Sequence, residues 1–186
     1  MEIVKTEIPD LLIIIPNIYN DERGYFFESY NKEKFLKHEL KFNFIQDNES
    51  KSVYGVIRGL HYQLAPYSQT KLVRVIEGKV FDVVVDLREG SPTYGKWLGV
   101  ELSAENKTQF LIPRGFAHGF SVLSETASLV YKCDNLYASE AERGLNFNDP
   151  QLNIDWKIDP ENAIVSAKDK ALPNFKEAEK NFMFRK

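Results

Sequence analysis

The chain has 186 residues, and its 24 Lys and Arg against 27 Asp and Glu give a net charge of −3. This length predicts one domain over residues 1–186, with a core large enough to fold without a disulfide or a structural metal. The weak negative charge without a basic cluster argues against nucleic acid as the main partner, and the single cysteine excludes both a disulfide framework within the chain and a CxxC zinc site.

The first residues give no sign of export or membrane insertion. Residues 1–10 are mixed and acidic, whereas a signal peptide begins with basic residues followed by a long apolar stretch. The longest apolar run nearby, Leu11–Ile15, has five residues, and a membrane-spanning helix needs about 20. We therefore expect a soluble, cytoplasmic protein with no membrane partner.

Short β-type runs broken by turn residues dominate the chain. Rich in Val, Ile, Phe and Tyr, they are Leu11–Ile15, Tyr25–Tyr30, Val53–Gln63, Lys71–Ile76, Lys79–Leu87, Trp97–Leu102, Gln109–Ile112, Gly119–Leu123 and Ser128–Asp134. Two short helices are predicted, at Lys32–Leu40 after the capping residue Asn31 and at Glu177–Phe182. Many short strands at this spacing predict an all-β sandwich or barrel.

The stretch Lys71–Leu87 has the clearest pattern. Two alternating arms flank Glu77-Gly78, which predicts a hairpin turn. In the second arm Asp82 and Asp86 lie on one face, and the alternation typical of antiparallel sheets favours a solvated face over a polar barrel lumen. Lys71 shares a face with two valines of its own arm, so it lies at the mouth of whatever those valines line.

A histidine and an arginine interrupt the apolar run Gly55–Gln63. His61 is either a hydrogen-bonded core residue or part of a site. Strict alternation places His61 and Arg58 on opposite faces, so both reach one site only if the strand slips by a residue between them. Gly59 is the place where a bulge can provide that slip, and we predict an irregularity there.

Two other side chains, His118 and Tyr131, each allow two interpretations. His118 follows the turn residues Pro113 and Gly115, and it is either a turn residue bonded to the backbone or a functional group. Tyr131 is either a core tyrosine with a satisfied hydroxyl or a site residue. Cys133 is predicted to be a small buried hydrophobe, and His38, in a charged run, to be exposed.

The histidines argue against a metal site in such a barrel. No two of them are closer than 23 residues and no HxH pair occurs, although three or four ligands must converge on a metal ion. The remaining polar set of His, Tyr, Lys and carboxylates suits proton transfer, because His is a base near neutral pH and Lys stabilises a developing enolate oxygen.

Ten motifs in order along the chain resemble the dTDP-4-dehydrorhamnose 3,5-epimerase family. They lie at residues 21–28, 46–50, 55–63, 71–75, 86–92, 102–106, 112–120, 131–132, 148–150 and 166–169. The resemblance implies a cupin-type jelly roll (a double-stranded β-helix with a few short helices) that forms a homodimer and works without metal or organic cofactor. It implies an isomerase that epimerises C3 and C5 of dTDP-4-dehydro-6-deoxy-D-glucose to dTDP-4-dehydro-L-rhamnose through an enolate, in dTDP-L-rhamnose biosynthesis.

The same resemblance assigns residues to roles. It makes His61 the base, Asp169 the residue that orients it, Tyr131 the proton donor and Lys71 the partner of the keto oxygen. Contacts to the nucleotide and sugar are implied for Arg23, Phe26, Glu28, Gln46, Asn48, Arg58, His118, Glu142 and Lys168. In the family, the segment from Arg23 to Glu28 can reach the site of the partner subunit.

Other functions are kept as alternatives. Relatives epimerise only C3 or only C5, or isomerise the keto group, and a non-catalytic barrel that binds a sugar nucleotide would share the fold. One departure from the family pattern is Ala138, where a proline commonly follows the tyrosine, and we assign no function to this change. With His61 as the lone base, C3 and C5 must be presented to it in turn, which predicts that the sugar ring shifts or flips within one site.

Overall fold

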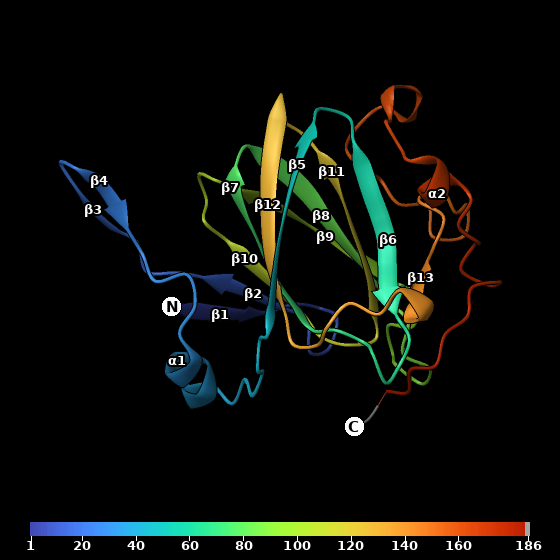
Figure 1. Cartoon of the computed structure of the whole chain (residues 1–186), viewed down its shortest axis with the longest axis horizontal. Coiled ribbons are helices and arrows are strands. Elements are labelled where there is room, and N and C mark those ends of the chain that lie inside the picture. Colours follow the sequence, from blue (N-terminus) through green and yellow to red (C-terminus); the bar gives the residue numbers. More distant parts are fainter. Residues whose placement is uncertain (185–186) are drawn as a thin grey trace.

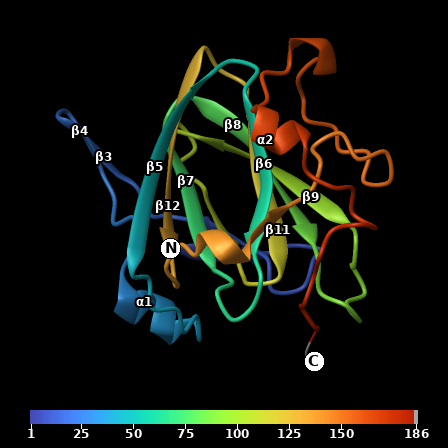
Figure 2. The same ribbon diagram turned by 45° about the vertical axis from the view of Figure 1, so that its right-hand side comes forward.

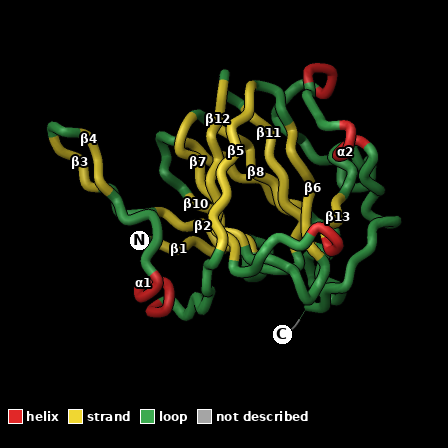
Figure 3. Tube along the Cα trace, viewed as in Figure 1, coloured by secondary structure: helices red, strands yellow, loops and turns green. Residues whose placement is uncertain are grey.

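Two antiparallel sheets packed face to face form the protein, in a computed structural model that describes residues 1–184 (Figures 1 and 3). The six-stranded sheet has the order β1 (Glu2–Lys5), β2 (Leu12–Ile15), β10 (Gln109–Ile112), β7 (Lys71–Glu77), β12 (Thr126–Cys133) and β5 (Gln46–Val53). The five-stranded sheet has the order β13 (Glu142–Gly144), β6 (Ile57–Gln63), β11 (Phe116–Val122), β8 (Lys79–Asp86) and β9 (Trp97–Ser103). The predicted all-β jelly roll is confirmed.

The main core lies between the two sheets, where alternate side chains of both meet. Val73 of β7, Val84 of β8 and Phe110 of β10 are fully buried there. Asp82 and Asp86 share the face of Val84 and are also fully buried, so the prediction of a solvated face is wrong. Their carboxylates are tolerated because each accepts hydrogen bonds, Asp82 from His118 and Asp86 from residues that include Arg88.

The predicted hairpin at Glu77-Gly78 is also wrong. β7 pairs with β10 and β12 in one sheet, whereas β8 pairs with β11 and β9 in the other. Gly78 therefore carries the chain across from sheet to sheet. Its φ is +73°, and a Cβ there would lie 2.0 Å from the carbonyl oxygen of Thr126, so only glycine fits. Alternation describes the faces of both arms correctly but does not specify which strand each arm pairs with.

A C-terminal segment covers the outer face of the five-stranded sheet and builds a second core (Figure 2). The segment includes the 3-10 turn η2 (Pro160–Asn162) and the short helix α2 (Ala167–Lys170). No helix forms at Glu177–Phe182, contrary to prediction. There Ala178 and Phe182 are buried in the second core, and the carbonyl of Phe182 accepts a hydrogen bond from the N–H of Glu89, so tertiary pairing replaces helical bonding.

The run Val53–Gln63 is two strands rather than one. β5 ends at Val53, and a turn at Tyr54-Gly55 takes the chain to β6 in the opposite sheet. Most of β5 and all of β1 were missed by the sequence pattern. In β5 the side chains are polar on both faces, because the strand lies at the sheet edge and one of its faces is exposed.

Helix α1 (Lys32–Lys37) packs on the outer face of the six-stranded sheet through its buried residue Phe35. As predicted, Asn31 caps it, with Oδ1 accepting the N–H of Lys34 at 3.1 Å. The helix is shorter than expected because Glu39 takes a left-handed conformation with φ of +63°. Before it, β3 (Tyr19–Asp21) and β4 (Gly24–Phe26) form a hairpin that projects from the sheets (Figure 1).

No helix in the part of the chain that the structure describes is long and apolar enough to cross a membrane.

Candidate active site

A cavity of about 500 Å³ opens between the two sheets, a volume that suits a small-molecule ligand. Strands from both sheets and the segment before α2 line it. Six of the residues assigned to the site by sequence lie on its wall: Arg58, His61, Lys71, His118, Tyr131 and Asp169. The structure therefore brings together five segments that are up to 111 residues apart, from position 58 to position 169.

The predicted irregularity at Gly59 is confirmed. The register of β6 against β11 shifts between the pair His118–His61 and the pair Phe120–Arg58. The slip places Arg58 and His61 on the same cavity wall, although strict alternation would separate them. Gly59 has φ of +123° and passes so close to β11 that a Cβ would lie 2.5 Å from the Cα of Gly119. Glycine is required here for both reasons.

His61 and Asp169 form a dyad. Nε2 of His61 donates to Oδ1 of Asp169 at 2.9 Å, which leaves Nδ1 without this proton and free to act as a base. The other oxygen, Oδ2, accepts the N–H of Gly59 at 3.3 Å. Burial alone would raise the pKa of Asp169, but the hydrogen bonds from His61 and Gly59 hold that pKa below its usual value. The carboxylate is thus kept ionised beside the imidazole.

The opposite sheet supplies an ammonium and a phenol. Lys71 of β7 and Tyr131 of β12 both line the cavity, and Nζ of Lys71 lies 5.7 Å from the centre of the Tyr131 ring. Burial lowers the pKa of Lys71, and the negative charges of Asp82 and Glu142 act against this shift. Burial raises the pKa of Tyr131, which keeps its hydroxyl protonated at neutral pH. Tyr131 therefore lines the cavity as well as packing against the main core.

His118 is a strand residue of β11, not a turn residue. It lies directly opposite His61 on the neighbouring strand β6. Its Nε2 is 2.9 Å from each carboxylate oxygen of Asp82, a residue of β8 that the sequence patterns did not assign to the site. Cys133 is buried as predicted, which raises the pKa of its thiol to about 11, and His38 is exposed.

Glu142 and Lys168 meet beside this cavity. Oε2 of Glu142 accepts from Nζ of Lys168 at 2.7 Å and from the hydroxyl of Tyr137 at 2.8 Å. Burial acts to raise the pKa of Glu142, but these two hydrogen bonds hold it below its usual value. The N–H of Tyr137 also donates to Gln46, so the loop around Ala138 is tied to β5 as well as to β13. Sequence reasoning did not assign Tyr137 a role.

Gln46 and Asn48 lie on β5, on the side of the strand that faces Tyr131. Asn48 is the cross-strand partner of Tyr131 and donates to the sulfur of Cys133 at 3.7 Å. Gln46 donates to Asn48 at 3.0 Å. Arg58, from the opposite sheet, donates to Ser52 of β5 at 2.9 Å, so the guanidinium links the two sheets at the cavity.

The three remaining predicted contacts lie on or after the projecting hairpin rather than at the cavity. The side chain of Arg23 is 86% exposed and pairs with Asp21 at 2.6 Å, and Phe26 is 70% exposed. Glu28 pairs with Lys34 at 2.8 Å beside α1. Within residues 1–184 the structure therefore does not bring Arg23, Phe26 or Glu28 to the site of their own chain.

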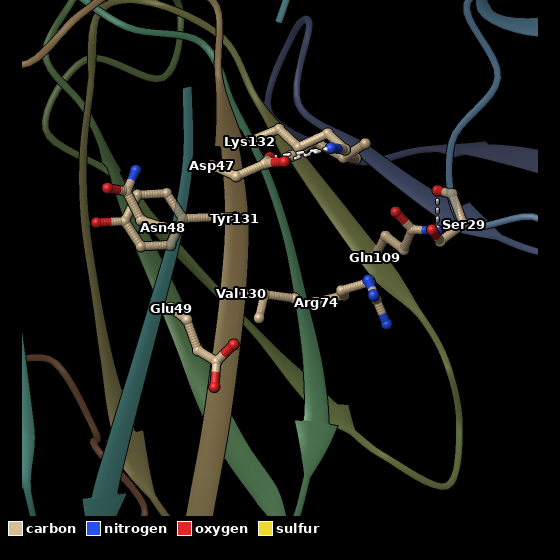
Figure 4. Close-up of a pocket in the computed structure, with 10 residues that line it drawn as sticks. Ser29, Asp47, Asn48, Glu49, Arg74, Gln109, Val130, Tyr131 and Lys132 are labelled. Carbon is tan, nitrogen blue, oxygen red and sulfur yellow. Dashed lines mark hydrogen bonds and ion pairs between the residues drawn. The ribbon is translucent and has the colours of Figure 1, made fainter. Parts of the chain in front are cut away.

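A second, polar depression lies on the outer face of the six-stranded sheet (Figure 4). Figure 4 shows that Asn48 and Tyr131 extend to one side of strands β5 and β12, while Asp47 and Lys132 form an ion pair of 2.9 Å on the other. Neighbouring residues of a strand thus divide between the cavity and the outer surface. Among residues 1–184, no three His, Cys, Asp or Glu side chains are grouped so that they could hold a metal ion.

The sequence is similar to those of known proteins along nearly its whole length. The sequence model of the family described as dTDP-4-dehydrorhamnose 3,5-epimerase matches residues 5–177. The dTDP-4-dehydrorhamnose 3,5-epimerase of Shigella flexneri is 55% identical over 170 residues, which cover 91% of this chain and 93% of that protein.

Two crystal structures are similar to this protein in both sequence and fold. The dTDP-4-dehydrorhamnose 3,5-epimerase of Elizabethkingia anophelis is 56% identical with a TM-score of 0.90, covering 95% of this chain and 97% of the other. The dTDP-6-deoxy-D-glucose-3,5-epimerase of Legionella pneumophila, solved with dTDP-4-keto-L-rhamnose, is 50% identical with a TM-score of 0.91, covering 95% and 93%. Because sequence and fold agree over almost the entire length of both partners, the chain belongs to the dTDP-4-dehydrorhamnose 3,5-epimerase family.

Proposed function

We propose that His61 and Tyr131 carry out the two proton transfers by which this isomerase inverts C3 and C5 of dTDP-4-dehydro-6-deoxy-D-glucose, giving dTDP-4-dehydro-L-rhamnose. One observation carries the proposal. His61 lies on β6 of the five-stranded sheet and is bonded to Asp169 of α2, whereas Tyr131 and Lys71 lie on the six-stranded sheet across the same cavity. A sugar ring between the sheets has the base on one face and the acid on the other, which is what an inversion needs.

The chemistry follows from the position of the keto group. C3 and C5 both flank the C4 carbonyl, so a proton on either carbon can leave as an enolate forms. Nδ1 of His61 takes that proton, and Asp169 stabilises the imidazolium that results. The ammonium of Lys71 stabilises the negative charge that develops on the C4 oxygen. The hydroxyl of Tyr131 then returns a proton to the opposite face and inverts the centre.

One base serves both carbons in this scheme. The cavity contains a second imidazole, His118, whose Nε2 is likewise bonded to a carboxylate, that of Asp82. The family resemblance assigns the base to His61 and a ligand contact to His118, and we keep both roles. The ring must then shift or flip so that C3 and C5 reach Nδ1 of His61 in turn.

Positive side chains around the cavity suit the diphosphate of a dTDP sugar. Arg58 lies on the cavity wall, and Lys168 stands beside it on α2. Charge-assisted hydrogen bonds from such groups are the usual means of holding phosphate oxygens. The Legionella pneumophila relative, solved with dTDP-4-keto-L-rhamnose, supports this class of ligand.

The deciding experiment is incubation with dTDP-4-dehydro-6-deoxy-D-glucose in heavy water. Deuterium is expected at both C3 and C5, and incorporation at one carbon would instead indicate a single-site epimerase. No incorporation with normal ligand binding would indicate a non-catalytic barrel. His61→Ala is expected to abolish exchange without unfolding, whereas His38→Ala, at an exposed histidine, is the matched control and keeps full exchange. Normal exchange by His61→Ala would remove His61 from its role.

The projecting hairpin supports a homodimer in which each subunit completes the site of the other. Arg23 and Phe26 are exposed on β3–β4, which projects away from the two sheets (Figure 1). Two aromatic side chains beside them, Tyr19 and Tyr25, are also more than half exposed. An exposed aromatic group rimmed by charges is typical of a surface that meets a partner.

A complementation experiment tests this arrangement. Arg23→Ala and His61→Ala each impair the homodimer, but a mixed dimer holds one intact site if the hairpin acts in the partner subunit. Random reassociation should therefore restore about a quarter of the wild-type sites. If the hairpin serves its own subunit, mixing restores nothing. Light scattering gives the oligomeric state independently.

The proposed location is the cytoplasm. A free, buried Cys133 as the sole cysteine is compatible with a reducing compartment. Cell fractionation with an antibody to the protein tests this directly.

A further inference from the structure

A second His–carboxylate pair in the cavity has no role in the proton transfers described above. Nε2 of His118 lies 2.9 Å from both Oδ1 and Oδ2 of Asp82. Asp82 is fully buried and His118 is 7% exposed, so the pair is shielded from water except through the cavity. A fully buried carboxylate is costly unless it is needed and well bonded, and a valine like its neighbours on β8 would pack there instead.

The pair is built by strand geometry. Asp82 on β8 is the cross-strand partner of Phe120 on β11, and His118 lies two residues from Phe120 on the same face. The two side chains are therefore diagonal neighbours on adjacent central strands of the five-stranded sheet. Neither strand can shift without moving the other, so the imidazole is held on a rigid part of the molecule.

The contact to Asp82 also fixes which ring nitrogen carries the proton. A carboxylate only accepts hydrogen bonds, so Nε2 must be the protonated nitrogen. No buried side-chain nitrogen or oxygen in the described part of the chain lacks a partner, and within residues 1–184 the side-chain hydrogen bonds of His118 are those of Nε2 with Asp82. Nδ1 therefore reaches the open cavity.

Resting on the proposed function, we propose that Asp82 is a positioning residue for the epimerase: it locks His118 as the Nε2–H tautomer and presents the Nδ1 lone pair to a hydroxyl group of the sugar. His118 then accepts a hydrogen bond from the substrate while His61, directly opposite on β6, removes the proton. The device selects ligands that offer an O–H at this point, because a group without a proton to donate leaves the lone pair of Nδ1 unpaired.

Asp82→Asn is the sharpest perturbation. Because both oxygens of Asp82 are equally close to Nε2, an amide places an oxygen and an NH₂ group at the same distance and cannot satisfy either tautomer fully. We expect kcat/KM to fall about 10- to 100-fold, mainly through KM, with dTDP binding unchanged. The exposed Asp155→Asn is the matched control and should leave both parameters unchanged.

A double-mutant cycle separates positioning from a structural role. If Asp82 acts through His118, the double variant with His118→Asn is no slower than His118→Asn alone. If the losses in kcat/KM of the two single variants instead multiply in the double variant, the proposal is overturned, because Asp82 would then act through Lys71 or through the stability of the fold.

Nitrogen-15 spectra of the wild-type protein provide a test that does not depend on any variant folding. They should show His118 with a proton on Nε2 and an unprotonated Nδ1, and a protonated Nδ1 would overturn the proposal. Deuterium incorporation by the wild-type enzyme is measured alongside. Its absence would refute the proposed function while leaving the tautomer result intact, so the two failures are distinguishable.

Discussion

Asp169→Asn tests the base dyad most directly, because the structure leaves the amide no satisfactory orientation. Asp169 accepts two hydrogen bonds, from Nε2 of His61 at 2.9 Å and from the N–H of Gly59 at 3.3 Å. An asparagine has one oxygen, so it can accept only one of them. If the oxygen faces Gly59, the NH₂ group faces Nε2 and forces the proton onto Nδ1, which then cannot act as a base. If it faces His61, the NH₂ group opposes the N–H of Gly59.

Each orientation has its own cost. The wrong tautomer removes the general base, which is worth about 10²–10⁴ in rate. An unsatisfied buried N–H costs about 1–3 kcal/mol of unfolding free energy. In either orientation the negative charge that stabilises the His61 imidazolium is lost, so we expect a loss of kcat of at least about 10². Binding of dTDP alone should be nearly unchanged.

The pH dependence of stability gives a second readout with a defined sign. The pKa of Asp169 lies below its usual value in the folded protein, so the ionised carboxylate stabilises the fold at neutral pH. This contribution is complete above the unfolded-state pKa and is lost as the pH falls through the lowered value. The difference in stability between wild type and Asp169→Asn should therefore shrink below about pH 4.

Deuterium exchange at C3 and C5, isothermal titration with dTDP and urea unfolding at several pH values measure the three effects. Asp155→Asn is the control, since Asp155 is exposed and outside the cavity. Exchange by Asp169→Asn within a few-fold of wild type would refute the reasoning, because the dyad would then not set the basicity or the tautomer of His61.

Three further substitutions have defined outcomes. Gly59→Ala adds a Cβ 2.5 Å from the Cα of Gly119 at a φ of +123°, so the free energy of unfolding should fall by about 2–4 kcal/mol. Gly90→Ala is the control for the cost of a positive φ alone, because Gly90 has φ of +82° and nothing lies within 4 Å of its Cβ. Equal losses for the two variants in urea unfolding would contradict a cost from the close approach to Gly119. Lys71→Met keeps the apolar stem but removes the charge, so kcat should fall about 10²–10³-fold in the epimerase assay, and turnover near the wild-type rate would exclude the enolate role. Hydrogen bonds from a lysine and two hydroxyl groups hold the pKa of Glu77 at about 2. The wild type should therefore be more stable than Glu77→Gln above the usual pKa of 4.5, and this difference in unfolding free energy should vanish as the pH falls to about 2. A stability difference that does not change with pH in urea titrations would disprove this.

Local patterns determined much of this molecule. Alternation correctly placed Lys71 on the interior side of its strand, with Val73 and Val75. The conflict between the expected faces of Arg58 and His61 correctly located the slip at Gly59. Those features depend on the period of a strand and on the special freedom of glycine, both of which can be read from neighbouring residues. The motif series assigned the chain to its family and named six residues that the fold gathers in one cavity.

Pairing and burial were decided only by the tertiary structure. The arms around Gly78 have the pattern of a hairpin, but they join different sheets because partners distant in the sequence cover their apolar faces. Asp82 has the pattern of a surface residue, yet it is fully buried because His118, 36 residues away, supplies its hydrogen bond. Alternation states which side chains share a face, whereas only the assembled sheets decide whether that face meets water, a second sheet or a substrate.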